Sequence, residues 1–160
     1  MLFRSKAKRF RRDYLAVIVL DDSITDASIA PVRKEFLAAA KDEKCRGVVL
    51  RVNSPGGSAL ASEVLWEATE EFKATGKPFV VSMGGVAASG GYYVAAGAER
   101  IFAEQGTITG SIGVVGMKIA LGGGMKLLGI TSHESKRGQH ADLMNTNRPF
   151  SDAEKGLVRK

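Results

Sequence analysis

One serine in this sequence stands between small residues in a Gly-rich loop. Ser89 lies within the segment Gly84-Gly-Val-Ala-Ala-Ser-Gly-Gly91, which follows an apolar run of strand length. In a nucleophile elbow, small neighbours allow a sharp strand-to-helix turn to present an exposed hydroxyl group. Ala87 stands where the elbow motif has its first Gly, and a serine between glycines is more often a helix cap. The residue types alone therefore leave two interpretations of Ser89 open, a nucleophile and a cap.

A second Gly-rich turn, Asn53-Ser-Pro-Gly-Gly57, also follows an apolar run. Pro55 restricts this turn, and Gly56 and Gly57 leave their backbone N–H groups unobstructed at the start of a helix. Such groups can stabilise the oxyanion of a tetrahedral intermediate, although Pro-Gly-Gly is often only a turn. Loops at the carboxyl ends of parallel strands line the ligand site of α/β folds. We therefore expect the two turns to lie side by side, which favours a catalytic role for both.

The elements that must position these turns follow from the hydrophobic pattern. Apolar runs predict strands over residues 15–20, 47–52 and 79–83. Helical spacing predicts a helix capped by Asp26 or Ser28, a second over residues 60–76 and a third over residues 92–98. Short β-like pieces follow at residues 101–103, 112–115 and 131–135, separated by Gly-rich turns, and Ser151 with Glu154 forms a capping box for a last helix. Strands that alternate with helices predict βαβ units and a parallel sheet.

The composition is that of one globular domain. The 160 residues are 44% hydrophobic and 25% charged, and the net charge is +6. The excess charge is local, because six basic residues crowd the first dozen positions: Arg4, Lys6, Lys8, Arg9, Arg11 and Arg12. We interpret residues 1–13 as a basic tail or linker and residues 14–160 as a single domain. Nucleic acid is not an expected partner, because no aromatic-rich face accompanies the charge.

Several other kinds of site are not expected. Cys45 is the only cysteine, so it should pack as a small buried hydrophobe. His133 and His140 have no recognised ligand spacing, and the segments 110–116 and 122–124 lack a phosphate-loop pattern, so we expect neither metal nor cofactor. No apolar stretch approaches the roughly 20 residues of a membrane span. We expect a soluble fragment whose membrane anchor, where one is needed, lies outside these residues.

Three ordered motifs resemble the bacterial signal peptide peptidase A family, which is serine peptidase family S49. They are Asn53-Ser-Pro-Gly-Gly57, the segment from Ser82 to Tyr93, and Thr109-Gly-Ser-Ile-Gly-Val-Val115, and the likeness runs from about Val17 to Met144. The resemblance implies an α/β fold of the Clp protease and crotonase superfamily, with stacked ββα (βαβ) units and a mostly parallel sheet. It also implies self-association into a homo-oligomeric ring. The implied activity is cleavage of remnant signal peptides at the bacterial cytoplasmic membrane by a Ser–Lys dyad, with an extracytoplasmic active site.

The resemblance assigns a role to individual residues. Ser89 corresponds to the nucleophile, Gly56 and Gly57 to the oxyanion turn, and Ser111 to a serine that helps to position the dyad lysine. Apolar groups near the expected cleft suit small or hydrophobic peptide side chains. The cleft residues that we expect are Met83, Gly84, Val86 and Val114.

The dyad lysine is missing from its expected place. Short members of the family carry it in a segment that reads roughly K-x-G-x-x-K-D-[IL]-M, and here Lys136–Met144 has Ala141 at that position. An alanine cannot accept a proton, and an unassisted serine is a weak nucleophile. Long members carry two homologous domains, with the lysine in the first and the serine in the second. We therefore expect a fragment that resembles the serine-bearing domain, is nearly inert alone and needs a lysine-bearing homologous domain.

Ala141 leaves three alternatives open. It could be an engineered inactivation, His140 with Asp142 could replace the lysine, or Lys118, Lys126 or Lys136 could serve if the alignment is shifted. Two rival functions also remain. A crotonase-like acyl-CoA enzyme would place carboxylates near the site, whereas residues 84–97 contain no Asp or Glu. A catalytically inactive scaffolding domain would account for Ala141 directly.

Overall fold

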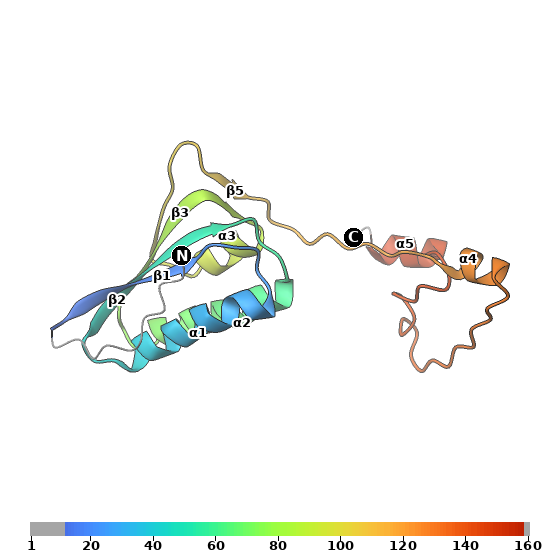
Figure 1. The fold of residues 1–160 in the computed structure, drawn as a ribbon, viewed down its shortest axis with the longest axis horizontal. Coiled ribbons are helices and arrows are strands. Elements are labelled where there is room, and N and C mark those ends of the chain that lie inside the picture. Colours follow the sequence, from blue (N-terminus) through green and yellow to red (C-terminus); the bar gives the residue numbers. More distant parts are fainter. Residues whose placement is uncertain (1–11, 159–160) are drawn as a thin grey trace. The chain divides into compact units, whose positions relative to one another are not determined.

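The computed structural model describes residues 12–158, and it divides the chain into two compact units (Figure 1). The first unit ends at Val114 and the second begins at Val115. A single domain over residues 14–160 stays a prediction.

The first unit is built on a parallel sheet. Its strands are β1 (Tyr14–Leu20), β2 (Cys45–Ser54), β3 (Phe79–Ala88) and β4 (Arg100–Phe102), in the order β1-β2-β3-β4. A further strand, β5 (Ile108–Gly110), pairs with the last residues of β3, and every one of these pairings is parallel. The carboxyl ends of β2 and β3 therefore lie at the same edge of the sheet, as the alternating pattern predicts.

Helices follow the strands in this unit. They are α1 (Asp26–Lys41), α2 (Ala59–Lys73) and the short α3 (Gly90–Ala95). Figure 1 shows α1 and α2 side by side below the sheet. The predicted cap of the first helix was wrong by at least one residue, because Thr25 is the N-cap and forms a capping box with Ser28. Thr25 accepts from the Ser28 amide, and Ser28 Oγ accepts from the Thr25 amide, so two amides at the start of the helix are satisfied.

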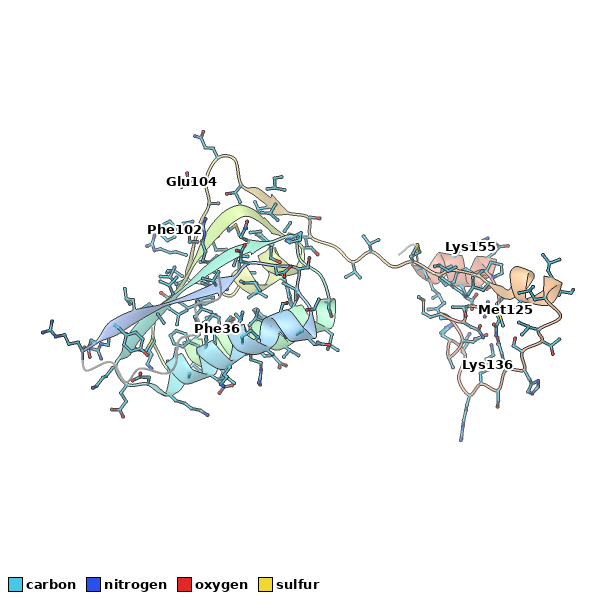
Figure 2. The ribbon with its side chains drawn as sticks, in the orientation of Figure 1. Phe36, Phe102, Glu104, Met125, Lys136 and Lys155 are labelled. Atoms are coloured by element: carbon cyan, nitrogen blue, oxygen red, sulfur yellow. The ribbon has the colours of Figure 1, made fainter. Side chains whose placement is uncertain are left out.

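The core lies between these helices and the sheet. Phe36 of α1, which Figure 2 labels, contacts Phe72 of α2 and Phe79 of β3 edge to face, with ring centroids 6.1 and 5.5 Å apart. All three rings are fully buried. Cys45 is buried with them, which confirms that it packs as a small hydrophobe. Aromatic contacts of this kind fix both helices against the strands that carry the two Gly-rich turns.

Several predicted boundaries differ from the structure. β3 continues through Gly84 and Gly85 to Ala88, because side chains on both sides hold this stretch of main chain. The β-like piece expected at 112–115 is not a strand. The segment that pairs with β3 is β5, which lies earlier in the chain. Residues 131–135 are not a strand either. The glycines at 122–124, expected to form a turn, begin the helix α4 (Gly122–Leu127).

The second unit contains α4 and α5 (Asp152–Val158), joined by a long irregular segment. Arg148 holds this segment together, because its guanidinium contacts Asp142 and Glu154, each at 2.7 Å. The capping box of Ser151 and Glu154 is confirmed by reciprocal hydrogen bonds of 2.7 and 3.3 Å. Within residues 12–158, no helix combines the length and the apolar character that crossing a membrane requires.

Candidate active site

Ser89 occupies a strained turn between a strand and a helix. It follows the last residue of β3 and precedes the first residue of α3, with φ 50° and ψ −119°. A positive φ is uncommon for a residue other than glycine, and holding one costs about 1–3 kcal/mol. Such strain persists where the surrounding structure enforces it, and the strand–serine–helix arrangement is that of a nucleophile elbow.

The backbone of Ser89 is anchored, whereas its hydroxyl group takes no part in capping. Its amide donates to Gly110 O and its carbonyl accepts from the Tyr93 amide, both at 2.9 Å. Ser89 stands at the N-cap position of α3, yet its side chain makes no hydrogen bond to the helix. The structure therefore disfavours the cap interpretation. The half-buried side chain leaves its hydroxyl available for chemistry.

The two Gly-rich turns touch each other at Gly56. A Cβ atom added there would lie 2.7 Å from Ser89 Cβ, 2.7 Å from Gly90 N and 2.9 Å from Ala88 O. Gly56 also has φ +98°, a conformation that side chains rarely adopt. Only glycine fits this position, and the expectation that the two turns lie side by side is confirmed.

The two glycines differ in how their amides are used. Gly56 N–H donates to the buried hydroxyl of Ser54 at 3.2 Å. Ile24 and Gly57 form an isolated parallel β-bridge. Its two hydrogen bonds run from Ile24 N to Gly56 O and from Ser58 N to Ile24 O, both at 2.8 Å, so neither involves the Gly57 N–H. The Gly56 amide is therefore engaged within its own turn, whereas the contacts around Gly57 are with Ile24. The sequence did not distinguish between them.

Like Ser89, Ser111 has a positive φ, here 49°, which is uncommon for a residue other than glycine. The carbonyl of the preceding residue, Gly110, accepts a hydrogen bond from the Ser89 amide. Ser111 is therefore next in sequence to a residue that contacts Ser89 directly. Its side chain is exposed. The position expected to help a dyad lysine therefore lies beside the Ser89 turn.

The four expected cleft residues have different surroundings. Met83 is buried in the core and its sulfur accepts a hydrogen bond from Thr109 Oγ1 at 3.4 Å. Gly84 is also buried, Val86 is half-buried and Val114 is 85% exposed. Of the three apolar side chains, only those of Val86 and Val114 reach the surface.

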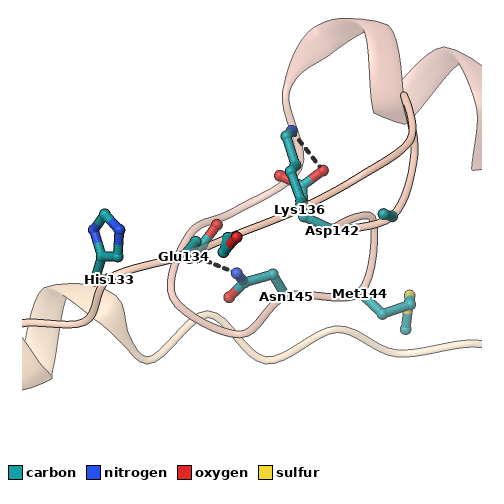
Figure 3. A pocket seen from close by; sticks show the side chains of 8 residues that line it. His133, Glu134, Lys136, Asp142, Met144 and Asn145 are labelled. Carbon is teal, nitrogen blue, oxygen red and sulfur yellow. Dashed lines mark hydrogen bonds and ion pairs between the residues drawn. The ribbon is translucent and has the colours of Figure 1, made fainter.

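Ala141 lies in the second unit, where it helps to line a pocket of about 430 Å³ (Figure 3). Asp142, the next residue, bonds to Arg148 at 2.7 Å and to Lys136 at 2.8 Å. The hydrogen bond from Arg148, followed by that from Lys136, lowers the pKa of Asp142 to about 2. Since both carboxylate oxygens are engaged, Asp142 is poorly placed to orient His140 as a substitute base.

Two of the alternative lysines contact other groups of the second unit. Lys118 donates to Leu143 O at 2.8 Å and lies 4.4 Å from the centroid of the Phe150 ring. Lys136 forms the ion pair with Asp142 that is drawn in Figure 3. Both amino groups are therefore already engaged within the second unit.

No metal-binding cluster is found in residues 12–158, which contain no group of three or more His, Cys, Asp or Glu side chains arranged to hold an ion.

Two family models match the chain. Peptidase family S49 matches residues 71–160, which include Ser89, Ser111 and Ala141. Clp protease matches residues 8–108, which include most of the sheet and both Gly-rich turns. Together the two matches cover the elements that form the site.

Named proteases are among the relatives. Protease 4 of Haemophilus influenzae is 44% identical over 108 residues, covering 68% of this chain and 16% of that protein. Protease 4 of Salmonella typhi is 39% identical over 139 residues, covering 82% and 22%. The chloroplastic serine protease SPPA of Arabidopsis thaliana is 36% identical over 161 residues, covering 93% and 24%. The chain thus spans less than a quarter of the length of these relatives.

The fold is also found among solved structures. A membrane-bound stomatin-specific protease, 1510-N, in a mutant form, aligns with a TM-score of 0.57 at 19% identity, covering 69% of this chain and 53% of that one. This likeness supports the α/β architecture of the Clp protease type that the parallel sheet displays. Because the model of peptidase family S49 matches more than half of its residues, the chain belongs to that family.

Proposed function

We propose that this chain is the serine-bearing part of a serine endopeptidase that uses a Ser–Lys dyad, with Ser89 as the nucleophile. The observation that carries the proposal is the backbone of Ser89, a residue other than glycine held at φ 50° between β3 and α3. Its hydroxyl is not used as a helix cap, and the Gly56 turn lies against it. Strain, availability and adjacent amides together are what an acyl-transfer site requires.

The reaction that we propose proceeds through an acyl-enzyme. A neutral lysine takes the proton of Ser89 Oγ as the oxygen attacks the peptide carbonyl. A backbone amide of the Gly56-Gly57 turn stabilises the resulting oxyanion, and the protonated lysine then gives its proton to the leaving amine. Water releases the acyl group by the same steps in reverse order. Ser111, whose turn adjoins that of Ser89, helps to position the lysine.

We propose that this lysine comes from a homologous domain outside the chain. Ala141 stands at the position expected for it, and the amino groups of Lys118 and Lys136 are engaged by Leu143 O and Asp142. Burial of a lysine between two domains would lower its pKa and make it an effective base. Residues 1–13 would then belong to the connection between the two domains.

The remaining features of the proposal follow the family resemblance. The substrates are remnant signal peptides or other hydrophobic membrane-associated peptides, and Val86 and Val114 offer apolar side chains to them. The assembly is a homo-oligomer at the bacterial cytoplasmic membrane, with an extracytoplasmic active site. The chain would meet the membrane through segments outside its own residues.

Labelling with a serine-reactive fluorophosphonate tests the proposal. The chain is treated alone and together with a lysine-bearing S49 domain, and the labelled residue is identified by mass spectrometry. We expect labelling of Ser89 only when the second domain is present, and none in a Ser89→Ala variant. The absence of labelling under every partner condition would reject the enzyme and leave the inactive scaffolding domain, which Ala141 also favours.

A further inference from the structure

One side chain at the end of β2 contacts the strands on both sides of it. Asn53 Nδ2 donates a hydrogen bond to Asp21 Oδ1 at 2.7 Å. Asn53 Oδ1 accepts a hydrogen bond from the Val86 amide at 3.2 Å. Asp21 directly follows β1, and Val86 lies near the end of β3. A single amide therefore connects the carboxyl ends of three neighbouring strands.

β3 bulges opposite this residue. The residue before Asn53 pairs with Met83 and the residue after it pairs with Ala87, so residues 84–86 lie opposite Asn53 alone. A bulge interrupts the main-chain hydrogen bonds of a sheet. Asn53 Oδ1 supplies the acceptor that the β2 main chain does not offer to the Val86 amide. The side chain thus replaces part of the strand pairing.

Close packing holds the bulge from both sides. A Cβ atom added to Gly84 would lie 2.8 Å from Asn53 Oδ1 and 2.9 Å from Asn53 Cβ, so glycine is needed for the amide to lie against the main chain there. On the opposite side, Thr107 Oγ1 donates to Gly84 O at 2.8 Å. The path of β3 before Ser89 is therefore fixed by these two side chains.

We propose that Asn53 is a positioning residue for Ser89, an inference that rests on the nucleophilic role proposed for that serine. Ser89 follows Val86 by three residues, and its contact with Gly56 depends on the register that the bulge establishes. A slip of one residue in a strand reverses which face each side chain occupies. A much smaller displacement, on the order of 1 Å, can lower the rate of a positioned reaction about 100-fold. Asn53 acts on the reaction through the main chain of β3.

An exchange of the two hydrogen-bonding side chains tests this role. Asn53→Asp retains an acceptor oxygen, but repulsion between its carboxylate and that of Asp21 should displace it from the Val86 amide. The double variant Asn53→Asp with Asp21→Asn restores a donor and an acceptor in reversed order. Asp21→Asn alone is the matched control, because the new amide oxygen still accepts from Asn53 Nδ2. Asn53→Ala removes both contacts.

The chain is paired with a lysine-bearing S49 domain, and fluorophosphonate labelling of Ser89 is measured as a maximal rate and an apparent affinity. We expect Asn53→Ala and Asn53→Asp each to lower the maximal rate by about 10- to 100-fold with little change in affinity. The double variant and Asp21→Asn should return to within about threefold of the wild-type rate, since the hydrogen bonds are remade. In parallel, hydrogen exchange of the Val86 amide in the chain alone should be about 10-fold faster in the two impaired variants and normal in the other two.

The outcomes separate the positioning role from the proposed function. A normal labelling rate in Asn53→Ala would overturn the positioning role and leave Ser89 as the nucleophile. Failure of the double variant to recover would also overturn it, because a general loss of packing is not repaired by exchanging two side chains. A wild type that never labels would refute both, and the exchange data would then identify Asn53 as a structural contact only.

Discussion

The contact between the two Gly-rich turns can be tested by comparing two glycines that share a positive φ but differ in their surroundings. Gly56 has φ +98° and a Cβ there would lie 2.7 Å from Ser89 Cβ and from Gly90 N. Gly76, just beyond α2, has φ +75° and nothing within 4 Å of such an atom. Substitution by alanine therefore costs backbone strain at both positions and steric overlap only at Gly56.

The magnitudes follow from these contacts. A left-handed conformation costs an alanine about 1–2 kcal/mol, which is the whole expected effect of Gly76→Ala. Overpacking adds about 1–3 kcal/mol at Gly56, where two of the three nearest atoms belong to the backbone and cannot move aside cheaply. We expect losses in the free energy of unfolding of about 1 kcal/mol for Gly76→Ala and about 3 kcal/mol for Gly56→Ala.

Urea denaturation can measure this difference. Trp66 is the only tryptophan and lies on α2, so its fluorescence reports the first unit. With a slope of about 1.5 kcal/mol per molar urea, the midpoint should fall by about 0.7 M for Gly76→Ala and by about 2 M for Gly56→Ala. Equal shifts for the two variants, or a smaller shift for Gly56→Ala, would refute the close approach of the two turns.

Three further predictions concern charge and chemistry. Lys77 Nζ donates to three carbonyl oxygens at the end of α1 at 2.8–3.0 Å, so Lys77→Met should cost about 1–2 kcal/mol in the same urea assay. Lys73→Met, which breaks only the partly exposed ion pair within α2, should cost less than about 0.5 kcal/mol, and similar costs for both would contradict the capping role. Ala141→Lys should raise fluorophosphonate labelling of the isolated chain about 100-fold whereas Ala141→Met should not, and equal labelling of the two would argue against a general base at this position. The pKa of Asp142, lowered to about 2 from the ordinary 3.8, makes its stabilising contribution complete above pH 3.8 and lost as the pH falls through 2. Amide NMR signals of residues 141–145 should follow this transition, and Arg148→Gln should move it to higher pH; an unchanged midpoint would exclude Arg148 as the main cause.

Much of the first unit could be predicted because its hydrophobic pattern and its fold agree. The apolar runs of β1 and β2 are recognisable without neighbours, and the rule for parallel strands correctly brought Gly56 to Ser89. The extension of β3 could not be predicted, because Gly84 and Gly85 usually end a strand. They continue it here because the side chains of Asn53 and Thr107 hold the main chain from two other segments.

The second unit was less predictable. Arg148 connects Asp142 with Glu154, and nothing in their spacing along the chain distinguishes this network from ordinary surface charges. The helix α4 begins with three glycines, which have poor helix propensity and more often form turns. The contact of Asn53 with Asp21 was missed for a similar reason, because it depends on a neighbouring strand. An amide directly before Ser-Pro-Gly-Gly was the available signal.

The backbone of Ser89 also sets a limit on how this protein could be made more stable. Glycine would adopt φ 50° without the strain that serine bears there, and two glycines already follow it. An engineer who ranked substitutions by folding free energy alone would therefore choose glycine at this position. That choice would remove the hydroxyl group on which the proposed chemistry depends. The residue that would give the higher stability at this position differs from the one that the proposed chemistry needs. Any redesign for thermostability therefore has to keep Ser89 and its strained backbone.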